Sequence, residues 1–185
     1  MRKTILSLLT LIVVSTASAK GEAATDVIST LRKVNDYFMM KYADPTLPTN
    51  VNRVRPSSLW TRAVYYEGLM ALYEIDNDQR YIDYTDRWGN FHKWTPRNGV
   101  KTNDADDQCC GQTYLERYMQ SGGEEKIKPI LENLDNQMQT PNTHKPEAEG
   151  SLYGWWTWID AIQMAMPVYM QAYKITGERK YIYDT

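Results

Sequence analysis

The sequence is poor in cysteine, and this shortage limits the kinds of protein it can encode. Only two cysteines occur in 185 residues, and they are neighbours, Cys109 and Cys110. Adjacent cysteines rarely reach disulfide geometry without strain, so a disulfide scaffold is excluded. The pair has no histidine or cysteine cluster at ligand spacing and makes a poor metal site. We therefore expect two small buried apolar side chains, with no metal and no cofactor.

Long apolar segments are also lacking. The longest apolar-dominated run, residues 5–14, is well short of the about 20 residues that a membrane-spanning helix needs. Arg2 and Lys3 precede this run, and the small residues 17–19 follow it, which is the pattern of a secretory signal peptide. We expect cleavage after residue 19, export of the mature chain, and no membrane association of the mature chain.

No strong charge of one sign is present. The formal net charge is −2, and loss of Arg2 and Lys3 with the signal peptide would make it −4. A mildly acidic chain of mixed sign argues against a nucleic-acid partner. The sequence also contains no phosphate-binding glycine loop, no nucleophile elbow and no H-E-x-x-H motif, so nucleotide chemistry, serine hydrolysis and zinc proteolysis are unsupported.

Helical periodicity dominates what remains. Apolar residues at three- and four-residue steps predict an amphipathic helix over residues 25–43. A segment with three prolines, 45–58, breaks the pattern, and Ser57 or Ser58 can cap the next helix, over 59–74. No long alternating run indicates a sheet.

Three segments repeat one pattern. Each has a tyrosine near the end of a predicted helix and an isoleucine nine residues later, with a short polar turn between them. The tyrosines are Tyr73, Tyr118 and Tyr173, and the isoleucines are Ile82, Ile127 and Ile182. Each unit therefore predicts a helical hairpin.

Such hairpins build the (α/α)6 barrel, which needs six of them to close. The chain supplies an N-terminal helix and three hairpin beginnings. We therefore expect an all-α fold, an (α/α)6 barrel present as an incomplete half. On this interpretation residues 20–185 are the N-terminal part of a single catalytic domain that is truncated at its C-terminus.

One carboxylate, Asp160, lies within the tryptophan-rich segment "YGWWTWIDAIQMAMPV". It has two interpretations. A functional acid could be tuned by the surrounding apolar rings. Alternatively, Asp160 and Gln163 form a capping box at the start of a helix, which would lower the pKa of the aspartate.

Several segments together resemble the unsaturated rhamnogalacturonyl hydrolases of glycoside hydrolase family 105. The strongest are "ADDQCCGQTYLERY" and "WWTWIDAIQMAMPVYMQAYKITGERKYI", supported by "WTRAVYYEGLMALYE" and "RWGNFHKW". More distantly, they are similar to the unsaturated glucuronyl hydrolases of family 88. The resemblance runs from about Val27 to the end and corresponds to the N-terminal half of such an enzyme. It also implies a bacterial source, so we expect the exported chain to be periplasmic or secreted.

The resemblance implies a hydration reaction on oligosaccharides left by polysaccharide lyases, here from pectin. An aspartic acid protonates C4 of the terminal unsaturated sugar acid. The resulting carboxylate then takes a proton from the water that attacks C5. The hemiketal opens and releases the rest of the oligosaccharide, so the carboxylate-separation rule for ordinary glycosidases does not apply.

Asp160 matches the acid/base position of the family, and Asp106 matches its second aspartate. An acid in this role needs a pKa above the usual value of about 4, and burial between Trp156 and Met164 would provide it. The dipole of the helix that Asp106 opens would keep Asp106 ionised. The alternative for Asp106 is a plain N-cap, shared with Asp104 or Asp107.

Other side chains are candidates for substrate binding. Trp60 and Trp156 could offer faces for sugar rings, and Arg62 could pair with the uronate carboxylate. We expect His92, on a predicted outer helix, to be structural, whereas the role of His144 stays open.

Two other functions remain possible. One is a family 88 type specificity for glucuronyl units of glycosaminoglycans, because "EAEGSLYG" lacks a histidine that the resemblance leads us to expect. The other is a helical glycan-binding module without catalysis. The placement of Asp106 and Asp160 distinguishes catalysis from the binding module, because catalysis requires both carboxyls to face one site.

Overall fold

The computed structural model describes residues 25–139 and 158–183. The chain divides into two compact units, the first ending at Ala43. The described part of the first unit is one helix, residues 25–41, as the apolar spacing predicts. The predicted signal peptide lies outside the described residues.

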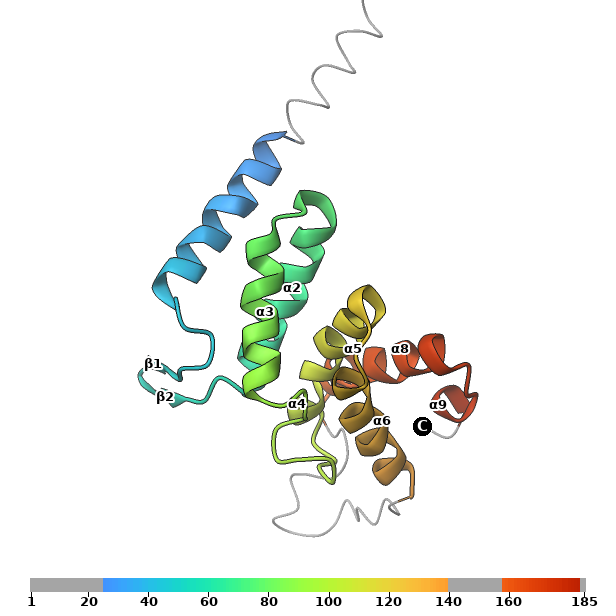
Figure 1. Cartoon of the computed structure of the whole chain (residues 1–185). Helices are drawn as coiled ribbons and strands as arrows, with labels where there is room; N and C mark the ends of the chain where they lie inside the picture. Colours follow the sequence, from blue (N-terminus) through green and yellow to red (C-terminus); the bar gives the residue numbers. More distant parts are fainter. Residues whose placement is uncertain (1–24, 140–157, 184–185) are drawn as a thin grey trace, which may run out of the picture. The chain divides into compact units, whose positions relative to one another are not determined.

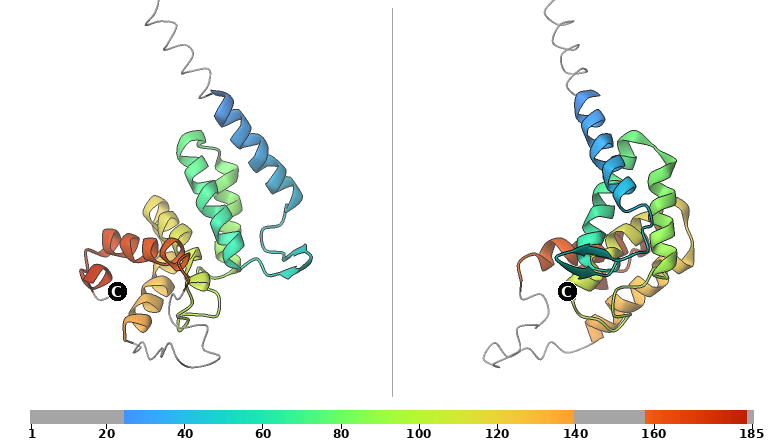
Figure 2. Two further views of the ribbon diagram at one scale, coloured as in Figure 1. Left: turned by 180° about the vertical axis from the view of Figure 1, so that it is seen from behind. Right: turned by 90° about the vertical axis from the view of Figure 1, so that its left-hand side faces the viewer.

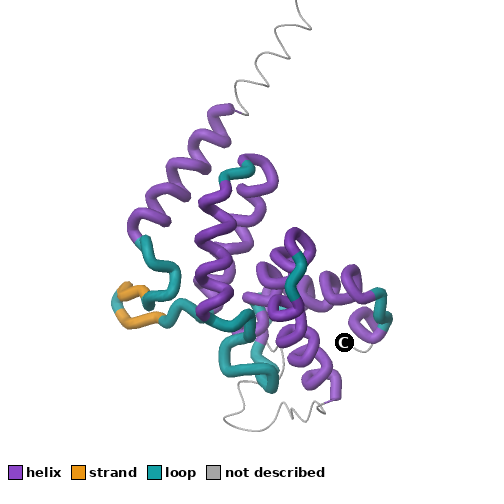
Figure 3. The backbone as a smooth tube through the Cα atoms, in the orientation of Figure 1, coloured by secondary structure: helices purple, strands orange, loops and turns teal. Residues whose placement is uncertain are grey.

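The second unit is built from helices, apart from two very short strands (Figures 1 and 3). In the described ranges, no helix has the length and apolar character that a membrane span requires. The elements in chain order are β1 (Thr49–Val51), β2 (Arg53–Arg55), α2 (Trp60–Asp76), α3 (Gln79–Phe91), α4 (Ala105–Gln108), α5 (Cys110–Ser121), α6 (Glu124–Gln139), α7 (Ala161–Met164), α8 (Met166–Thr176) and α9 (Lys180–Tyr183).

The two strands form an antiparallel hairpin where the sequence predicted only an irregular segment. Val51 pairs with Arg53, and Asn52 between them has a φ of 62°. Asparagine tolerates this left-handed conformation better than most residues, which permits the tight reversal. Strands of three residues are too short to produce a recognisable alternating pattern in the sequence.

The three predicted helical hairpins are confirmed. They are the pairs α2 and α3, α5 and α6, and α8 and α9. In each pair the carbonyl of the repeated tyrosine accepts a hydrogen bond from the residue that ends the first helix. The three bonds run from Asn77 to Tyr73 at 2.9 Å, from Gly122 to Tyr118 at 2.7 Å and from Gly177 to Tyr173 at 2.8 Å.

The first helices of the three hairpins contact one another in chain order. Helix α5 contacts α2 and α8, and each first helix contacts its own second helix, α3, α6 or α9. Figure 2 shows α2 and α3 lying side by side. The architecture is therefore all-α, with the hairpin organisation of helical barrel enzymes, as the sequence predicted.

Aromatic packing joins the first two hairpins. The rings of Tyr66 and Trp88 are stacked with centroids 4.0 Å apart, and Tyr114 lies 5.1 Å from Trp88 and from Trp94. All four rings are buried. A Cβ atom added at Gly89 would lie 2.3 Å from the Trp94 ring, so this position has no room for a side chain.

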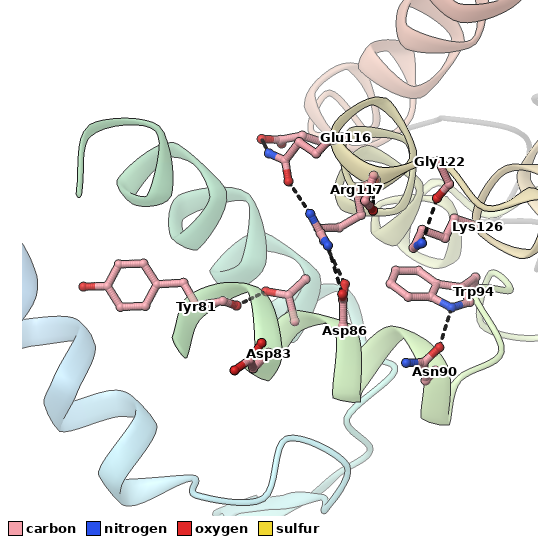
Figure 4. A network of polar contacts seen from close by, with 12 residues as sticks. Tyr81, Asp83, Asp86, Asn90, Trp94, Glu116, Arg117, Gly122 and Lys126 are labelled. Atoms are coloured by element: carbon pink, nitrogen blue, oxygen red, sulfur yellow. Dashed lines mark hydrogen bonds and ion pairs between the residues drawn. The ribbon is translucent and has the colours of Figure 1, made fainter. Parts of the chain in front are cut away.

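Polar contacts reinforce the same junction (Figure 4). Arg117 of α5 makes a bidentate ion pair with Asp86 of α3, at 2.7 and 2.9 Å. The guanidinium is almost fully buried, so removal of Asp86 would leave the positive charge of Arg117 in a poorly hydrated position. The ammonium of Lys126 lies 5.5 Å from the centre of the Trp94 ring and donates to the carbonyl of Gly122 at 2.7 Å.

The predicted serine cap of the second helix is wrong. Leu59 occupies the N-cap of α2, and no side chain caps it. Ser57 is instead buried, and its hydroxyl donates to the carbonyl of Thr46 at 2.8 Å. That bond uses the only hydroxyl hydrogen, so Nε2 of His92, 2.9 Å away, must carry the proton and donate to Ser57. The structural role expected for His92 is supported by this contact.

The first prediction concerns Gly177, which ends α8 with a φ of 73°. Nothing lies within 4 Å of a Cβ added there, so Gly177→Ala changes only the backbone preference. We expect a loss of about 1 kcal/mol in unfolding free energy, measured by urea denaturation. Gly68, inside α2 and also with open space around it, is the matched control. There alanine should stabilise by about 0.5–1 kcal/mol, and equal signs for the two variants would contradict this account.

The second prediction concerns Glu116 on α5. Burial, together with the negative charge of nearby Glu74, raises the pKa of Glu116 to about 7. The folded state then binds this proton more tightly than the unfolded state does. Stability should consequently fall as pH rises from about 4.5 to about 7. Because Glu116 is partly exposed, we expect screening to limit the change to about 1–2 kcal/mol. Urea titrations of wild type and Glu116→Gln across this range test it. A wild-type slope that persists unchanged in the variant would rule Glu116 out as the cause.

Candidate active site

The three acids of the "DADD" segment have three different environments. Asp104 is the N-cap of α4, and its carboxylate accepts from the backbone N–H of Asp106 at 3.0 Å. Asp107 is buried and accepts from Thr102 at 2.7 Å and from Asn98 at 2.9 Å. Capping and packing are therefore assigned to Asp104 and Asp107. Asp106 is left available for chemistry, and the N-cap alternative for it is wrong.

The ionised state predicted for Asp106 is not supported. Partial burial raises its pKa, and the negative charges of Asp104, Asp160 and Asp107 raise it further, against a smaller lowering effect of Arg97. Helix α4 has only four residues, too few for a strong dipole to offset these effects. Asp106 is thus a half-buried carboxyl with an elevated proton affinity.

Asp160 lies at the N-terminal boundary of α7. Its backbone carbonyl accepts from the N–H groups of Gln163 and Met164, both at 3.0 Å, but its side chain makes no cap bond. The capping-box alternative is therefore wrong. The predicted burial is also wrong, because Asp160 is exposed. The buried face of α7 consists of Ala161 and Met164, which follow it, and Trp156 lies outside the described residues.

The structure brings the two candidate carboxylates into one neighbourhood. Asp106 lies in α4, and Asp160 lies at the start of α7. These two helices contact each other. The negative charge of Asp160 acts on Asp106 and raises its pKa. Asp106 and Asp160 are 54 positions apart in the sequence, so only the tertiary fold places them together.

A second group of side chains surrounds α7. The carboxylate of Glu67 on α2 accepts from the Gln163 amide at 2.8 Å and from the Cys109 thiol at 3.1 Å. The side-chain amide of Gln112 on α5 donates to the carbonyls of Gln163 at 2.8 Å and Met164 at 3.2 Å. Residues from α2, α5 and α7 therefore meet beside Asp160.

Sequence reasoning missed Glu67 and Gln112. Gln112 lies in the "GQTY" part of the quoted motif, so its position six residues after Asp106 was a usable signal. Glu67 is one of many acids on a helix surface, and nothing in the sequence distinguishes it. Gln112 lies 51 and 52 positions from its two partners, and Glu67 lies 42 and 96 positions from its own.

The two cysteines are buried and free, as expected. The Cys109 thiol donates to Glu67, and burial raises the pKa of both thiols, that of Cys110 to about 12. They are therefore neutral side chains. Among the described residues no three of the types histidine, cysteine, aspartate and glutamate are placed to hold a metal ion.

Two of the predicted binding residues, Trp60 and Arg62, lie in α2. Trp60, the first residue of α2, is half-buried. Arg62 is 5% exposed, and its positive charge acts on Tyr84 and His92 of the first hairpin. Trp156 falls outside the described residues, as does His144. The binding roles of Trp60, Arg62 and Trp156 stay predictions.

An open groove of about 510 Å³ lies elsewhere, against α6 and the end of α8. Its lining includes Glu124, Glu132 and Asp135 of α6, together with Thr176, but neither candidate aspartate. We favour the region of Asp106 and Asp160, because it combines two coupled carboxyl groups with the specific sequence motifs.

The paired hairpins and the neighbouring carboxyls define the class of protein as an all-α chain of the helical barrel type. The family model of glycosyl hydrolase family 88 matches residues 30–185. The chain belongs to this family.

Individual relatives agree with this assignment. Over 141 residues the chain is 25% identical to an unsaturated 3S-rhamnoglycuronyl hydrolase from Alteromonas sp. (strain LOR), covering 68% of this chain and 33% of that protein. A solved structure described as a polysaccharide lyase matches with a TM-score of 0.70 and 26% identity, covering 88% of this chain and 44% of that one. A family 88 protein from Bacteroides vulgatus shares the fold, with a TM-score of 0.69, 24% identity and coverage of 86% and 44%. The chain thus spans less than half of these relatives.

The coupling of the two carboxyls generates the third prediction. Replacing Asp160 by Asn removes one of the negative charges that raise the pKa of Asp106. We expect the pKa of Asp106 to fall, measured from its carboxyl carbon by NMR titration. Asp83→Asn, on α3, is the control, because the charge of Asp83 is not among those that act on Asp106. An identical Asp106 titration in wild type and Asp160→Asn would show that the two groups are not coupled.

Proposed function

We propose that the protein hydrates the C4=C5 double bond of a terminal unsaturated uronyl residue. Its substrates would be oligosaccharides that polysaccharide lyases release from pectin, of the rhamnogalacturonan type. This is the specificity of family 105, a finer assignment than the family 88 membership. The observation that carries the proposal is the placement of Asp106 and Asp160 at contacting helices, with the charge of one acting on the other.

In this proposal Asp160 is the acid/base. It is exposed and so accessible to substrate. Its proton goes to C4, forming a C–H bond, while positive charge develops at C5 and the ring oxygen. Water then attacks C5 and gives its proton to the Asp160 carboxylate, which restores the acid. The hemiketal opens to a ketone at C5 and leaves a hemiacetal at C1, which breaks down to release the remaining oligosaccharide. The terminal sugar acid thus leaves as a keto acid that no longer has the double bond.

Asp106 has a supporting role in the same proposal. Two neighbouring carboxyls can hold one proton at a pH where an isolated aspartate would be ionised. Burial and three negative charges raise the pKa of Asp106, so the pair holds a proton more readily than an isolated aspartate does. This shared proton supports the acid role of Asp160 in the proposal.

The name of the Alteromonas relative supports an unsaturated uronyl substrate, since that protein is a rhamnoglycuronyl hydrolase. A glucuronyl specificity of the family 88 type remains the second candidate, favoured by the family match itself. Export rests on the sequence alone, as does binding of the sugar by Trp60, Arg62 and Trp156.

The fourth prediction tests this function with protein expressed from its complete open reading frame. Hydration removes the conjugated C4=C5 bond, so ultraviolet absorbance of lyase-generated rhamnogalacturonan disaccharides should decay. We expect Asp160→Asn to slow this decay by at least about 100-fold, because proton transfer contributes that much or more. Asp83→Asn should match the wild type.

The possible outcomes separate the candidate functions. Faster decay with glycosaminoglycan products than with rhamnogalacturonan products would favour the glucuronyl specificity. No decay with either substrate would leave a glycan-binding module as the better account. Full activity of Asp160→Asn would remove Asp160 from the mechanism.

A further inference from the structure

Helix α7 depends on contacts from other helices. It has four residues, and isolated helices shorter than about 12–15 residues are marginal in water. Its last carbonyl groups also lack partners within the helix itself. Contacts to those groups, together with the packing of α7 against α4 and α8, therefore set where α7 lies and with it the position of Asp160 at its start.

Gln112 supplies those partners from α5. Its side-chain amide donates to the carbonyl of Gln163 at 2.8 Å and to that of Met164 at 3.2 Å. One amide thus joins two consecutive carbonyls at the end of α7. Because Gln112 has two donor hydrogens, both bonds can form at the same time.

Glu67 holds the same turn from α2. One carboxylate oxygen accepts from the side-chain amide of Gln163 at 2.8 Å, and the other accepts from the Cys109 thiol at 3.1 Å. Cys109 is fully buried at the junction of α4 and α5. The Glu67 carboxylate therefore links α7 to the segment that carries Asp106.

Both contacts join residues that are close in sequence to the two candidate aspartates. Gln112 is six residues after Asp106, and Gln163 is three residues after Asp160. We propose that Gln112 and Glu67 are positioning residues that hold Asp160 at its working place beside Asp106. This inference rests on the proposed function for its catalytic consequence, whereas the placement itself can be measured without any activity.

A purely structural role for Gln112 would give a different result. Loss of a structural hydrogen bond lowers stability but leaves the interaction between the two carboxyls unchanged. Loss of a positioning contact lets α7 move, so the charge of Asp160 acts less strongly on Asp106. The titration of Asp106 therefore distinguishes the two roles.

The fifth prediction uses Gln112→Met, which keeps the length of the side chain and removes both donors. Gln139→Met, at the exposed end of α6, is the matched control. We expect the NMR titration midpoint of Asp106 to fall in Gln112→Met and to stay at the wild-type value in the control. On the substrate that the wild type hydrates, kcat should fall by about 100-fold, as a displacement of about 1 Å can cause, with little change in KM.

A second variant keeps the test decisive if Gln112→Met fails to fold. Gln163 is exposed, so Gln163→Met should fold normally while losing the contact with Glu67. It should also lower the Asp106 midpoint. An unchanged midpoint in a folded variant of either kind would overturn the positioning role. A wild type without hydrolase activity would refute the proposed function alone, because the NMR result would still report the placement.

Discussion

The packing of α5 between α2 and α8 is the constraint on which the other features depend. A Cβ atom at Gly111 would lie 2.8 Å from Val168, so α5 and α8 approach more closely there than any larger residue would allow. One turn later Tyr114 and Leu115 are fully buried, and Arg117 is paired with α3. Because α5 contacts both neighbouring first helices, it fixes the register in which the three hairpins meet.

The candidate site forms at the beginning of this central helix. Two one-turn helices, α4 and α7, contact each other at that point. Short helices have weak dipoles and few internal hydrogen bonds. Neighbouring charges and burial therefore have the larger effect on the pKa of carboxyl groups in them. For this reason the proton affinity of Asp106 follows burial and the charges of Asp104 and Asp160, against the expectation from helix position.

Sequence patterns predicted the hairpins well because the signal is local. Each repeated tyrosine, such as Tyr118, lies four residues before the residue that ends its helix, and this spacing is a property of one helical turn. The short strands and the cap of α2 were missed for the opposite reason. A three-residue strand has almost no pattern, and Ser57 is drawn away by Thr46, a partner 11 residues earlier in the chain.

By itself the sequence determined the helical class, the three hairpins and the motifs that single out the two candidate aspartates, because composition and spacing within a few turns carry that information. Tertiary structure alone decided that Asp106 and Asp160 are neighbours, that Asp104 and Asp107 have structural roles, and that Gln112 and Glu67 hold α7. These features arise from contacts between residues as many as 96 positions apart. Burial and charge at such contacts exist only once the helices have packed.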